Sequence, residues 1–444
     1  MHVAFVAISG VRAANEELTR VGLTLPGFVE RSQVIASLPS LGLLTLAGMT
    51  PDRFDVSYHE VVDVAALDVL PPCDVAAISS YSAQIRDAYA LADRFRAQGV
   101  RVVLGGIHVT ALPDEASEHA DAVVVGEGEG SWPDLLDDLT RGRLQPMYGA
   151  DGRAFDLADS PMPRFDLLEI ERYNRLTVQT QRGCPWRCEF CASSMRLTPR
   201  YSVKPVDRVL AEIHAIRRLW PRPFIEFADD NSFVDRRQAK ELLRALAPEG
   251  LRWFTECDVS IADDDELLDL MRASGCREVL IGLESPSIAA VDGIELRRNW
   301  KHGRVRRYLE SIDRIQSHGI AVNGCFVLGL DGDGPEVFDA VEAFVHRSGQ
   351  FDVQITVMTP FPGTPLYERL LAEGRLLDAT AWERCSLFDV NFRPRRMSAE
   401  ALQRGLIELG QRLYTESERS ARRDRFYEQR RRFRRQQRIG RMSA

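Results

Sequence analysis

Residues 181–194 read Gln-Arg-Gly-Cys-Pro-Trp-Arg-Cys-Glu-Phe-Cys-Ala-Ser-Ser, and three of the chain's eight cysteines lie in this stretch: Cys184, Cys188 and Cys191. Spacings of four and three residues let three thiolates converge on one side of a small inorganic cluster. Gly183 and Pro185 favour an irregular loop over a helix. The first hypothesis is therefore a metal site on a loop, and the rest of the chain is interpreted around it.

Two simpler explanations compete with a cluster. A structural zinc ion takes four protein ligands, often as two separated pairs, and no second Cys-x-x-Cys or His pair lies nearby in the sequence. Ordinary buried cysteines occur singly, whereas three beside a Gly- and Pro-marked loop would make a poor core segment. Three thiolates instead suit a [4Fe-4S] cluster with one iron left open for a small-molecule ligand.

The cysteine spacing, with the aromatic Phe190 directly before the third cysteine, resembles the radical S-adenosylmethionine (SAM) family. This resemblance implies that Cys184, Cys188 and Cys191 hold the cluster. It also implies that SAM binds the open iron through its amino and carboxylate groups, and that Phe190 is a cofactor contact.

The length of 444 residues predicts two or three domains. No apolar run is long enough to span a bilayer, and the N-terminus enters a strand without a basic segment or cleavage site, which favours the cytoplasm. The eight cysteines do not resemble a disulfide framework. The formal net charge of −8 gives no general case for nucleic-acid binding.

Residues 1–145 alternate apolar strands with amphipathic helices, which is typical of a parallel sheet. The expected strands are Val3–Ile8, Val56–Val61, Asp74–Ser79, Arg101–Leu104 and Ala122–Val125. The expected helices lie near Leu41–Met49, Ile85–Gln98 and Trp132–Leu139. The pattern predicts an α/β fold that begins with a flavodoxin-like doubly wound domain.

Ligands of such sheets bind at the carboxyl ends of the strands, and three of those ends carry small or polar residues. The candidate contacts are Ser79, Ser80, Gly105, Gly106, His108, Gly126 and Glu127. Glycines also end many strands only to make a turn, so a structural explanation stays open. The order of these loops resembles the cobalamin-binding domain that precedes the cluster motif in class B radical SAM enzymes, which implies cobalamin as a cofactor.

One departure concerns the lower face of the cobalt. The Asp-x-His-x-x-Gly motif that supplies a cobalt-ligating histidine in cobalamin mutases is absent, because the loop after the first strand reads Ser9-Gly10-Val11-Arg12-Ala13. We therefore expect no histidine from that motif. For His108, a local hydrogen bond is favoured over cobalt ligation.

Residues 146–171 contain several Pro and Gly residues and predict a linker. Residues 172–375 then repeat strand-then-helix units. The expected strands are Thr177–Gln181, Phe224–Ala228, Trp253–Glu256, Val279–Leu283, Val322–Leu328 and Val353–Thr359. The expected helices are Val206–Leu219, Arg236–Ala247, Asp264–Ser274, Val305–His318 and Pro335–Arg347. Six units predict a partial (β/α)6 barrel whose working edge carries the cysteine loop.

Polar or small residues recur at the carboxyl ends of these barrel strands. The candidates are Asp229, Asp230, Glu256, Glu284 and Gly324. Each acid alone could be a helix cap, but together they could bind the ribose and amino group of SAM. Their segments resemble the SAM-binding strand ends of the family. A ligand role is favoured most for Glu284 and least for Glu256, whose strand phase is ambiguous.

The positions of the remaining cysteines argue against a second iron–sulfur cluster. Cys257, Cys276 and Cys325 lie in or beside apolar runs and are expected in the core. A methylthiotransferase would need three N-terminal cysteines for its second cluster, but residues 1–145 contain only Cys73. That branch of the family is disfavoured.

Residues 376–444 resemble the C-terminal extension of hopanoid-methylase-like proteins and predict two helices. The last part, residues 422–441, is crowded with arginine. A solvated or frayed terminal helix is the favoured interpretation. Contact with an anionic membrane surface or with nucleic acid is the alternative.

The resemblance implies a cobalamin-dependent radical SAM methyltransferase that acts on an unactivated carbon of a small-molecule or lipid substrate. In such enzymes one electron from the cluster cleaves SAM to a 5′-deoxyadenosyl radical, and methylcobalamin methylates the substrate radical. A reductant such as flavodoxin or ferredoxin is implied. Two alternatives stay open: a radical cyclase, oxidase or rearrangement enzyme with the same cofactors, and a non-catalytic electron-transfer or sensing protein.

Overall fold

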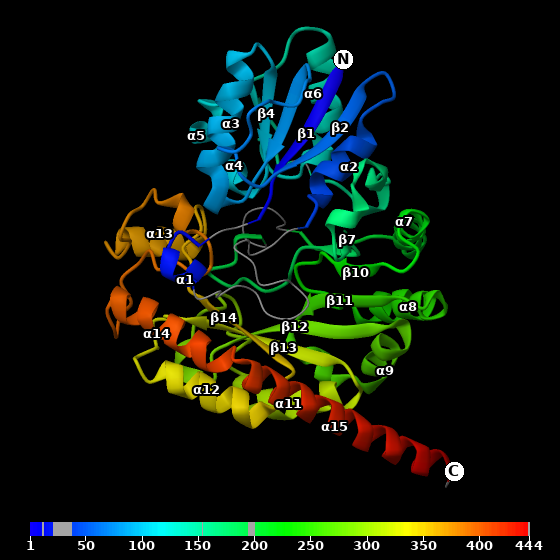
Figure 1. The fold of residues 1–444 in the computed structure, drawn as a ribbon, viewed down its shortest axis with the longest axis vertical. Coiled ribbons are helices and arrows are strands. Elements are labelled where there is room, and N and C mark those ends of the chain that lie inside the picture. The colour runs from blue at the N-terminus through cyan, green and yellow to red at the C-terminus, as the bar shows by residue number, and fades with distance from the viewer. Residues whose placement is uncertain (11–12, 21–37, 153, 194–199, 443–444) are drawn as a thin grey trace.

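The computed structural model describes residues 1–442 except 11–12, 21–37, 153 and 194–199. Two six-stranded sheets dominate it, the first near the N-terminus and the second below it in Figure 1. Every strand pair within both sheets is parallel. The α/β class and the flavodoxin-like and partial-barrel architecture expected from the sequence are confirmed.

The first sheet has the strand order β2-β1-β3-β4-β5-β6. Its strands are β1 (His2–Ile8), β2 (Asp55–Val61), β3 (Val75–Ser79), β4 (Arg101–Gly105), β5 (Ala122–Val124) and β6 (Met147–Tyr148). Strand β6 pairs with β5, so this sheet extends past residue 145 into the segment expected as a linker. Two residues are too short for periodicity to reveal a strand.

Helices cover both faces of the first sheet. On one face are α3 (Ile85–Ala97), α4 (Ile107–Ala111) and α5 (Pro113–Ser117), and on the other are α2 (Leu41–Met49) and α6 (Trp132–Thr140). Strand β1 is buried from Val3 to Ile8 because both of its faces are covered. A continuous apolar run, rather than an alternating one, is what such a strand requires.

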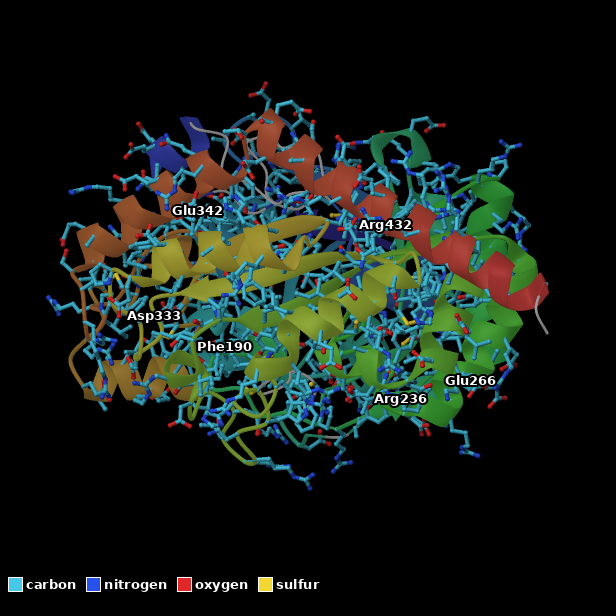
Figure 2. All side chains as sticks on the ribbon, turned by 90° about the horizontal axis from the view of Figure 1, so that it is seen from below. Phe190, Arg236, Glu266, Asp333, Glu342 and Arg432 are labelled. Atoms are coloured by element: carbon cyan, nitrogen blue, oxygen red, sulfur yellow. The ribbon has the colours of Figure 1, made fainter. Side chains whose placement is uncertain are left out.

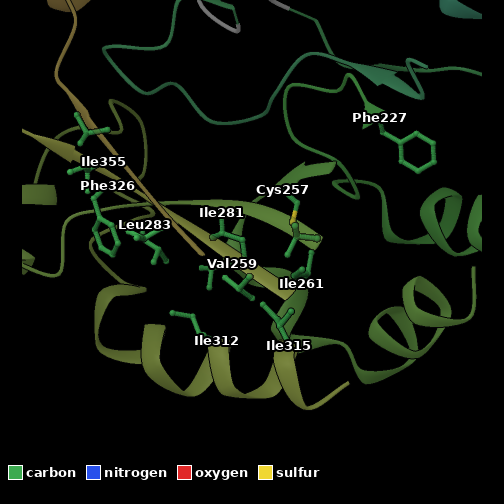
Figure 3. Close-up of a cluster of buried hydrophobic side chains, with 14 of the residues drawn as sticks. Phe227, Cys257, Val259, Ile261, Ile281, Leu283, Ile312, Ile315, Phe326 and Ile355 are labelled. Carbon is green, nitrogen blue, oxygen red and sulfur yellow. The ribbon is translucent and has the colours of Figure 1, made fainter. Parts of the chain in front are cut away.

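The second sheet has the order β14-β13-β12-β11-β10-β7. Its strands are β7 (Leu176–Val178), β10 (Phe224–Phe227), β11 (Arg252–Cys257), β12 (Cys276–Glu284), β13 (Ala321–Leu328) and β14 (Asp352–Val357). The helices between them are α7 (Val206–Leu219), α8 (Arg236–Leu246), α9 (Asp265–Ser274), α11 (Tyr308–Ser317) and α12 (Val337–Ser348). Figure 3 shows their shared core, in which Ile281, Phe326 and Ile355 from neighbouring strands pack with Ile312 of α11.

The predicted first barrel strand, Thr177–Gln181, is divided in two. Strand β7 ends at Val178, and Gln181–Arg182 forms a separate short strand, β8, which pairs antiparallel with β9 (Ser202–Val203). The chain thus leaves the barrel sheet before the cysteines. This hairpin frames the cysteine loop from both ends.

The C-terminal helices α14 (Ala399–Leu413) and α15 (Glu416–Met442) pack outside the second sheet (Figure 1). Arg422 and Phe426 of α15 are buried, and the ring of Phe426 lies 5.2 Å from that of Phe351. The first half of the arginine-rich helix is therefore docked through Arg422 and Phe426, which differs from a frayed terminus, while Arg425 and Arg431 beside them are exposed as a solvated helix predicts. Further along α15, Arg432 is exposed (Figure 2).

The cysteines and the lengths of the helices bear on whether the chain contains disulfides or crosses a membrane. All eight cysteines are free thiols. Cys257 and Cys276 are buried in the core of the second sheet as expected, whereas Cys325 is only half-buried. In the described part of the chain, no helix combines the length and apolar character needed to cross a membrane.

Candidate functional site

The carboxyl ends of β3, β4 and β5 lie side by side. Ser79 pairs in register with Gly105, and Gly105 with Val124. Gly106 has a φ of +108°, and a Cβ atom there would lie 2.9 Å from the Ser79 hydroxyl oxygen. The three loops singled out from the sequence therefore form one continuous edge.

This edge has room and unused polar groups for a ligand. Gly126 has a φ of +79°, and a Cβ atom built there would meet nothing within 4 Å. Ser80 is half-buried, and its hydroxyl donates a 3.3 Å bond to the neighbouring Tyr81 carbonyl. At the end of β1, the buried Ser9 hydroxyl has no partner among the described residues. A buried unpaired hydroxyl is costly, so a polar ligand is a natural partner for it.

His108 is not placed to ligate cobalt. Its side chain is fully buried, and its Nε2 lies 3.3 Å from a Glu115 carboxylate oxygen. Its ring packs edge-on against Trp382 and Tyr89. Burial lowers the pKa of His108 despite the opposing effect of Glu115. The favoured sequence interpretation, a local hydrogen bond, fits this position, and a cofactor contact by His108 does not.

Cys188 is buried, and Cys184 and Cys191 are half-buried. Burial raises the pKa of Cys184 to about 11 and that of Cys188 to about 12. Such thiols ionise at neutral pH only when a metal charge stabilises the thiolate. The described residues contain no group of three His, Cys, Asp or Glu side chains gathered around a single metal ion. A cluster avoids that requirement, because each cysteine binds a different iron.

The backbone before the cysteine loop is held by Asp229. Its carboxylate accepts hydrogen bonds from the Thr180 amide at 2.8 Å, the Thr180 hydroxyl at 2.6 Å, the Gln181 amide at 3.0 Å and the Ser232 hydroxyl at 2.8 Å. Asp229 is only 5% exposed. Its carboxylate is thus occupied by protein donors, and SAM binding by Asp229 stays a prediction.

The next two residues hold the loop itself. Asp230 accepts a 2.6 Å bond from the Gly183 amide and another bond from the Ser193 hydroxyl. The Asn231 side-chain amide lies 3.6 Å from the Cys184 sulfur and donates to Asp258 at 3.0 Å. The segment expected to bind SAM therefore also positions both ends of the cysteine loop.

Asp258 is a positioning residue that the candidate set from the sequence did not include. It accepts hydrogen bonds from the Trp186 indole at 3.0 Å and the Ser260 amide at 2.8 Å, in addition to Asn231. Burial alone would raise the pKa of Asp258, but these hydrogen bonds lower it. Its place at the end of β11 was the available signal, because acids at that edge meet the loop after β7.

Glu284, the acid favoured most as a SAM ligand, has a close partner in the protein. The Glu284 carboxylate lies 2.6 Å from the Lys301 ammonium, which also donates to the Gly282 carbonyl at 2.8 Å. Glu284 is a non-glycine residue with a φ of +62°, a conformation that costs energy and directs its side chain back over Gly282. The acid expected first as a SAM ligand is thus paired with a lysine 17 residues later.

Glu256 lies deep in the molecule but faces open space. Burial and the carboxylates of Glu226 and Asp230 raise its pKa from 4.5 to about 7. It is the predicted acid that remains most available to a ligand.

Two further candidates are enclosed by protein. A Cβ atom on Gly324 would lie 2.6 Å from the Gln350 side-chain nitrogen and 2.9 Å from a Leu283 methyl carbon. Its missing side chain serves internal packing rather than the approach of a cofactor. Phe190 (Figure 2) is half-buried and packs against the core of the second sheet, next to Cys191.

One arginine joins the two candidate cofactor edges. Arg182, two residues before Cys184, donates to Glu127 at 2.9 Å and to Glu129 at 2.6 Å. All three side chains are 15% exposed or less. Glu127 also accepts the Phe155 amide at 2.9 Å. The residue expected to contact cobalamin therefore holds its loop against the cysteine loop.

Glu256 gives a pH-dependent prediction. The folded protein holds the proton of the Glu256 carboxyl more tightly than the unfolded chain, because the pKa is raised in the fold. The protonated carboxyl therefore stabilises the fold fully below pH 4.5, and this stabilisation is lost as the pH rises through about 7. Glu256→Gln should therefore raise the melting temperature relative to the wild type at pH 8, and the gain should shrink towards pH 4.5. The control Glu368→Gln, at an exposed site, should change the melting temperature by the same amount at every pH. If the increase in melting temperature of Glu256→Gln does not vary with pH, the raised pKa of Glu256 is contradicted.

Gly126 gives a prediction about the edge of the first sheet. Gly126→Leu should weaken hydroxocobalamin binding by about tenfold or more, because the side chain would occupy the open space at the strand ends. Gly99 has nearly the same conformation, with a φ of +78° and nothing within 4 Å, but precedes β4 at the opposite edge. Absorbance titrations should show normal affinity for Gly99→Leu; equal losses in both variants would mean that backbone strain, not ligand contact, is responsible.

Comparisons with known proteins agree with this arrangement. Residues 178–347 match the radical SAM superfamily, residues 33–136 match the B12 binding domain, and residues 364–443 match a domain of unknown function (DUF4070). The structure of TsrM from Kitasatospora setae, with cobalamin and a [4Fe-4S] cluster bound, superposes with a TM-score of 0.66 at 16% identity. That match covers 94% of this chain and 89% of TsrM, and supports the fold.

The sequence relatives include methyltransferases from several bacteria. The bacteriochlorophyllide d C-12(1)-methyltransferase of Chlorobaculum tepidum is 30% identical over 85% of this chain and 83% of its own length. The hopanoid C-2 methylase of Rhodopseudomonas palustris is 29% identical over 78% of this chain and 66% of its own length. The chain matches both family models and is similar to these methyltransferases over most of its length. The chain therefore belongs to the radical SAM methyltransferases that carry a cobalamin-binding domain.

Proposed function

We propose that this enzyme uses its cluster, SAM and cobalamin to methylate an unactivated carbon atom of a small-molecule or lipid substrate. The observation that carries the proposal is the Arg182 bridge to Glu127 and Glu129. It fixes the cysteine loop beside the loop that follows β5. Radical formation and methyl transfer must take place on one substrate, so both cofactor edges have to border the same space.

When bound, the cluster and SAM supply a radical that abstracts hydrogen, and cobalamin supplies the methyl group. The protein's own residues position these groups. Asp229, Asp230 and Asp258 hold the cysteine loop, and the Ser79 and Gly126 loops leave room at the opposite edge. Glu256, whose side chain is exposed near the end of β11, is available to a SAM or substrate hydroxyl.

The substrate class follows from the relatives and from the chemistry of the site. The similar proteins named above act on a bacteriochlorophyllide and on hopanoids, which are large and mainly apolar molecules. Both names describe methylation at a carbon position of the substrate. The electrons are proposed to come from a small protein carrier of the flavodoxin or ferredoxin type.

The function is tested by labelling the methyl group of SAM with deuterium. Anaerobic turnover of the reconstituted enzyme with candidate apolar substrates should yield 5′-deoxyadenosine and a product that carries the labelled methyl group. Cys188→Ala should abolish both products because a cluster ligand is lost, whereas Cys73→Ala, which changes a half-buried cysteine of the first domain, should retain them.

The other outcomes identify the alternative activities. 5′-Deoxyadenosine with an unlabelled, altered substrate would indicate a radical cyclase, oxidase or rearrangement enzyme. No 5′-deoxyadenosine from the wild type under reducing conditions would indicate a non-catalytic cluster protein. Either result would refute methyl transfer.

A further inference from the structure

Residues 297–307, here called the basic segment, read Arg-Arg-Asn-Trp-Lys-His-Gly-Arg-Val-Arg-Arg. Five arginines and one lysine, without an acid, stand out in a chain whose formal net charge is −8. The segment follows β12 and precedes α11, so it lies outside the regular helices of the barrel. No step of the proposed methyl transfer uses its exposed arginines.

The basic segment is fastened directly to the cysteine loop. The buried Glu295 carboxylate accepts the Arg187 amide at 3.1 Å and the Arg298 amide at 2.7 Å. Glu295 also forms an isolated antiparallel bridge with Cys188. A side chain on this segment therefore keeps a fixed position relative to the cluster ligands.

A pair of stacked indoles makes the same connection. Trp186 lies between Cys184 and Cys188 in the sequence, and its ring stacks on that of Trp300 with centroids 4.6 Å apart and planes 22° apart. The Arg304 guanidinium lies 5.4 Å from the centroid of the Trp300 ring. Densely packed rings thus connect the outer surface of the basic segment with the loop that holds the cluster.

The charge of the segment is only partly neutralised. Arg304 and Arg307 pair with Asp263 at 2.5 and 3.2 Å. Arg297, Arg298 and Arg306 are exposed, and the described residues give them no acidic partner within ion-pair distance. The apolar side chain of Leu296 is 51% exposed beside them. An apolar residue among unpaired cations is a surface suited to an acidic protein partner.

We propose that the basic segment is the docking surface for an acidic one-electron carrier protein that reduces the cluster. The inference rests on the proposed function, because the radical SAM reaction requires an electron at the cluster. In each encounter the carrier loses one electron and the cluster gains it, and no bond forms or breaks. Encounters between redox proteins are small and transient, and complementary charge increases their rate of association.

The position of the segment decides between possible partners. An anionic membrane or a nucleic acid could also bind arginines, but neither requires a rigid connection to a cluster ligand. An electron carrier does, because the electron must cross a short and densely packed distance. The rigid contacts through Glu295 and the Trp186–Trp300 stack therefore favour the carrier.

The test uses the reconstituted full-length enzyme and pre-reduced flavodoxin or ferredoxin. Stopped-flow absorbance should show that Arg298→Glu/Arg306→Glu slows reduction of the cluster by either carrier by about tenfold or more at low ionic strength. The effect should largely disappear at high salt. The control Arg218→Glu/Arg222→Glu makes the same change in net charge on exposed residues at and beyond the end of α7, and should change the rate by less than about twofold.

A small chemical reductant separates this inference from the proposed function. With titanium(III) citrate, the wild type and both double variants should cleave SAM at the same rate. If titanium(III) supports no cleavage in any of them, the proposed function fails. If cleavage is normal but neither carrier reduces the wild type, or both double variants slow the carriers equally, the docking proposal is wrong.

A vesicle assay completes the comparison. Arg298→Glu/Arg306→Glu and the control Arg218→Glu/Arg222→Glu should have the same affinity for vesicles that contain phosphatidylserine. Loss of vesicle binding in this variant alone, with unchanged carrier kinetics, would identify the basic segment as a membrane surface and overturn the proposal.

Discussion

The arrangement of this enzyme depends on one partly buried ionic contact, that of Arg182 with Glu127 and Glu129. The guanidinium comes from the strand that enters the cysteine loop, and the carboxylates come from the loop after β5 of the B12-binding domain. Burying three charges is costly, and removing one partner of such a contact typically destabilises a protein by roughly 3–5 kcal/mol. Here the contact sets the position of one cofactor edge relative to the other.

A second group of carboxylates holds the cysteine loop in place through hydrogen bonds. Asp229, Asp230 and Asp258 bind backbone amides, hydroxyls and the Trp186 indole around the cysteine loop. A loop with Gly and Pro residues has few backbone hydrogen bonds of its own, so these acids provide what regular secondary structure provides elsewhere. Glu295 does the same from the outer side. The rigid loop can then accept the same cluster geometry in every molecule.

Most of the fold could be predicted from the sequence, because buried parallel strands such as β1 leave continuous apolar runs and α7 has a clear helical period. Strand β6 and the β8–β9 hairpin are too short to leave a period. The cysteines could be proposed as cluster ligands from the sequence, because a cluster constrains the spacing of its ligands along the chain. The partner of Glu284 was not, since Lys301 reaches it from an irregular segment whose path no local pattern specifies. Glu256 was ranked low because strand phase alone does not show which side of β11 faces open space.

The central claim is that the cobalamin and cluster edges border one space, and paramagnetic coupling tests it most directly. Cobalamin in the Co(II) state and the reduced cluster both carry unpaired electrons, so electron paramagnetic resonance of the fully loaded enzyme reports their separation. The account predicts a resolved spin–spin interaction in the wild type, weakened in Arg182→Ala. Two independent signals in the wild type, unchanged from those of singly loaded samples, would contradict it.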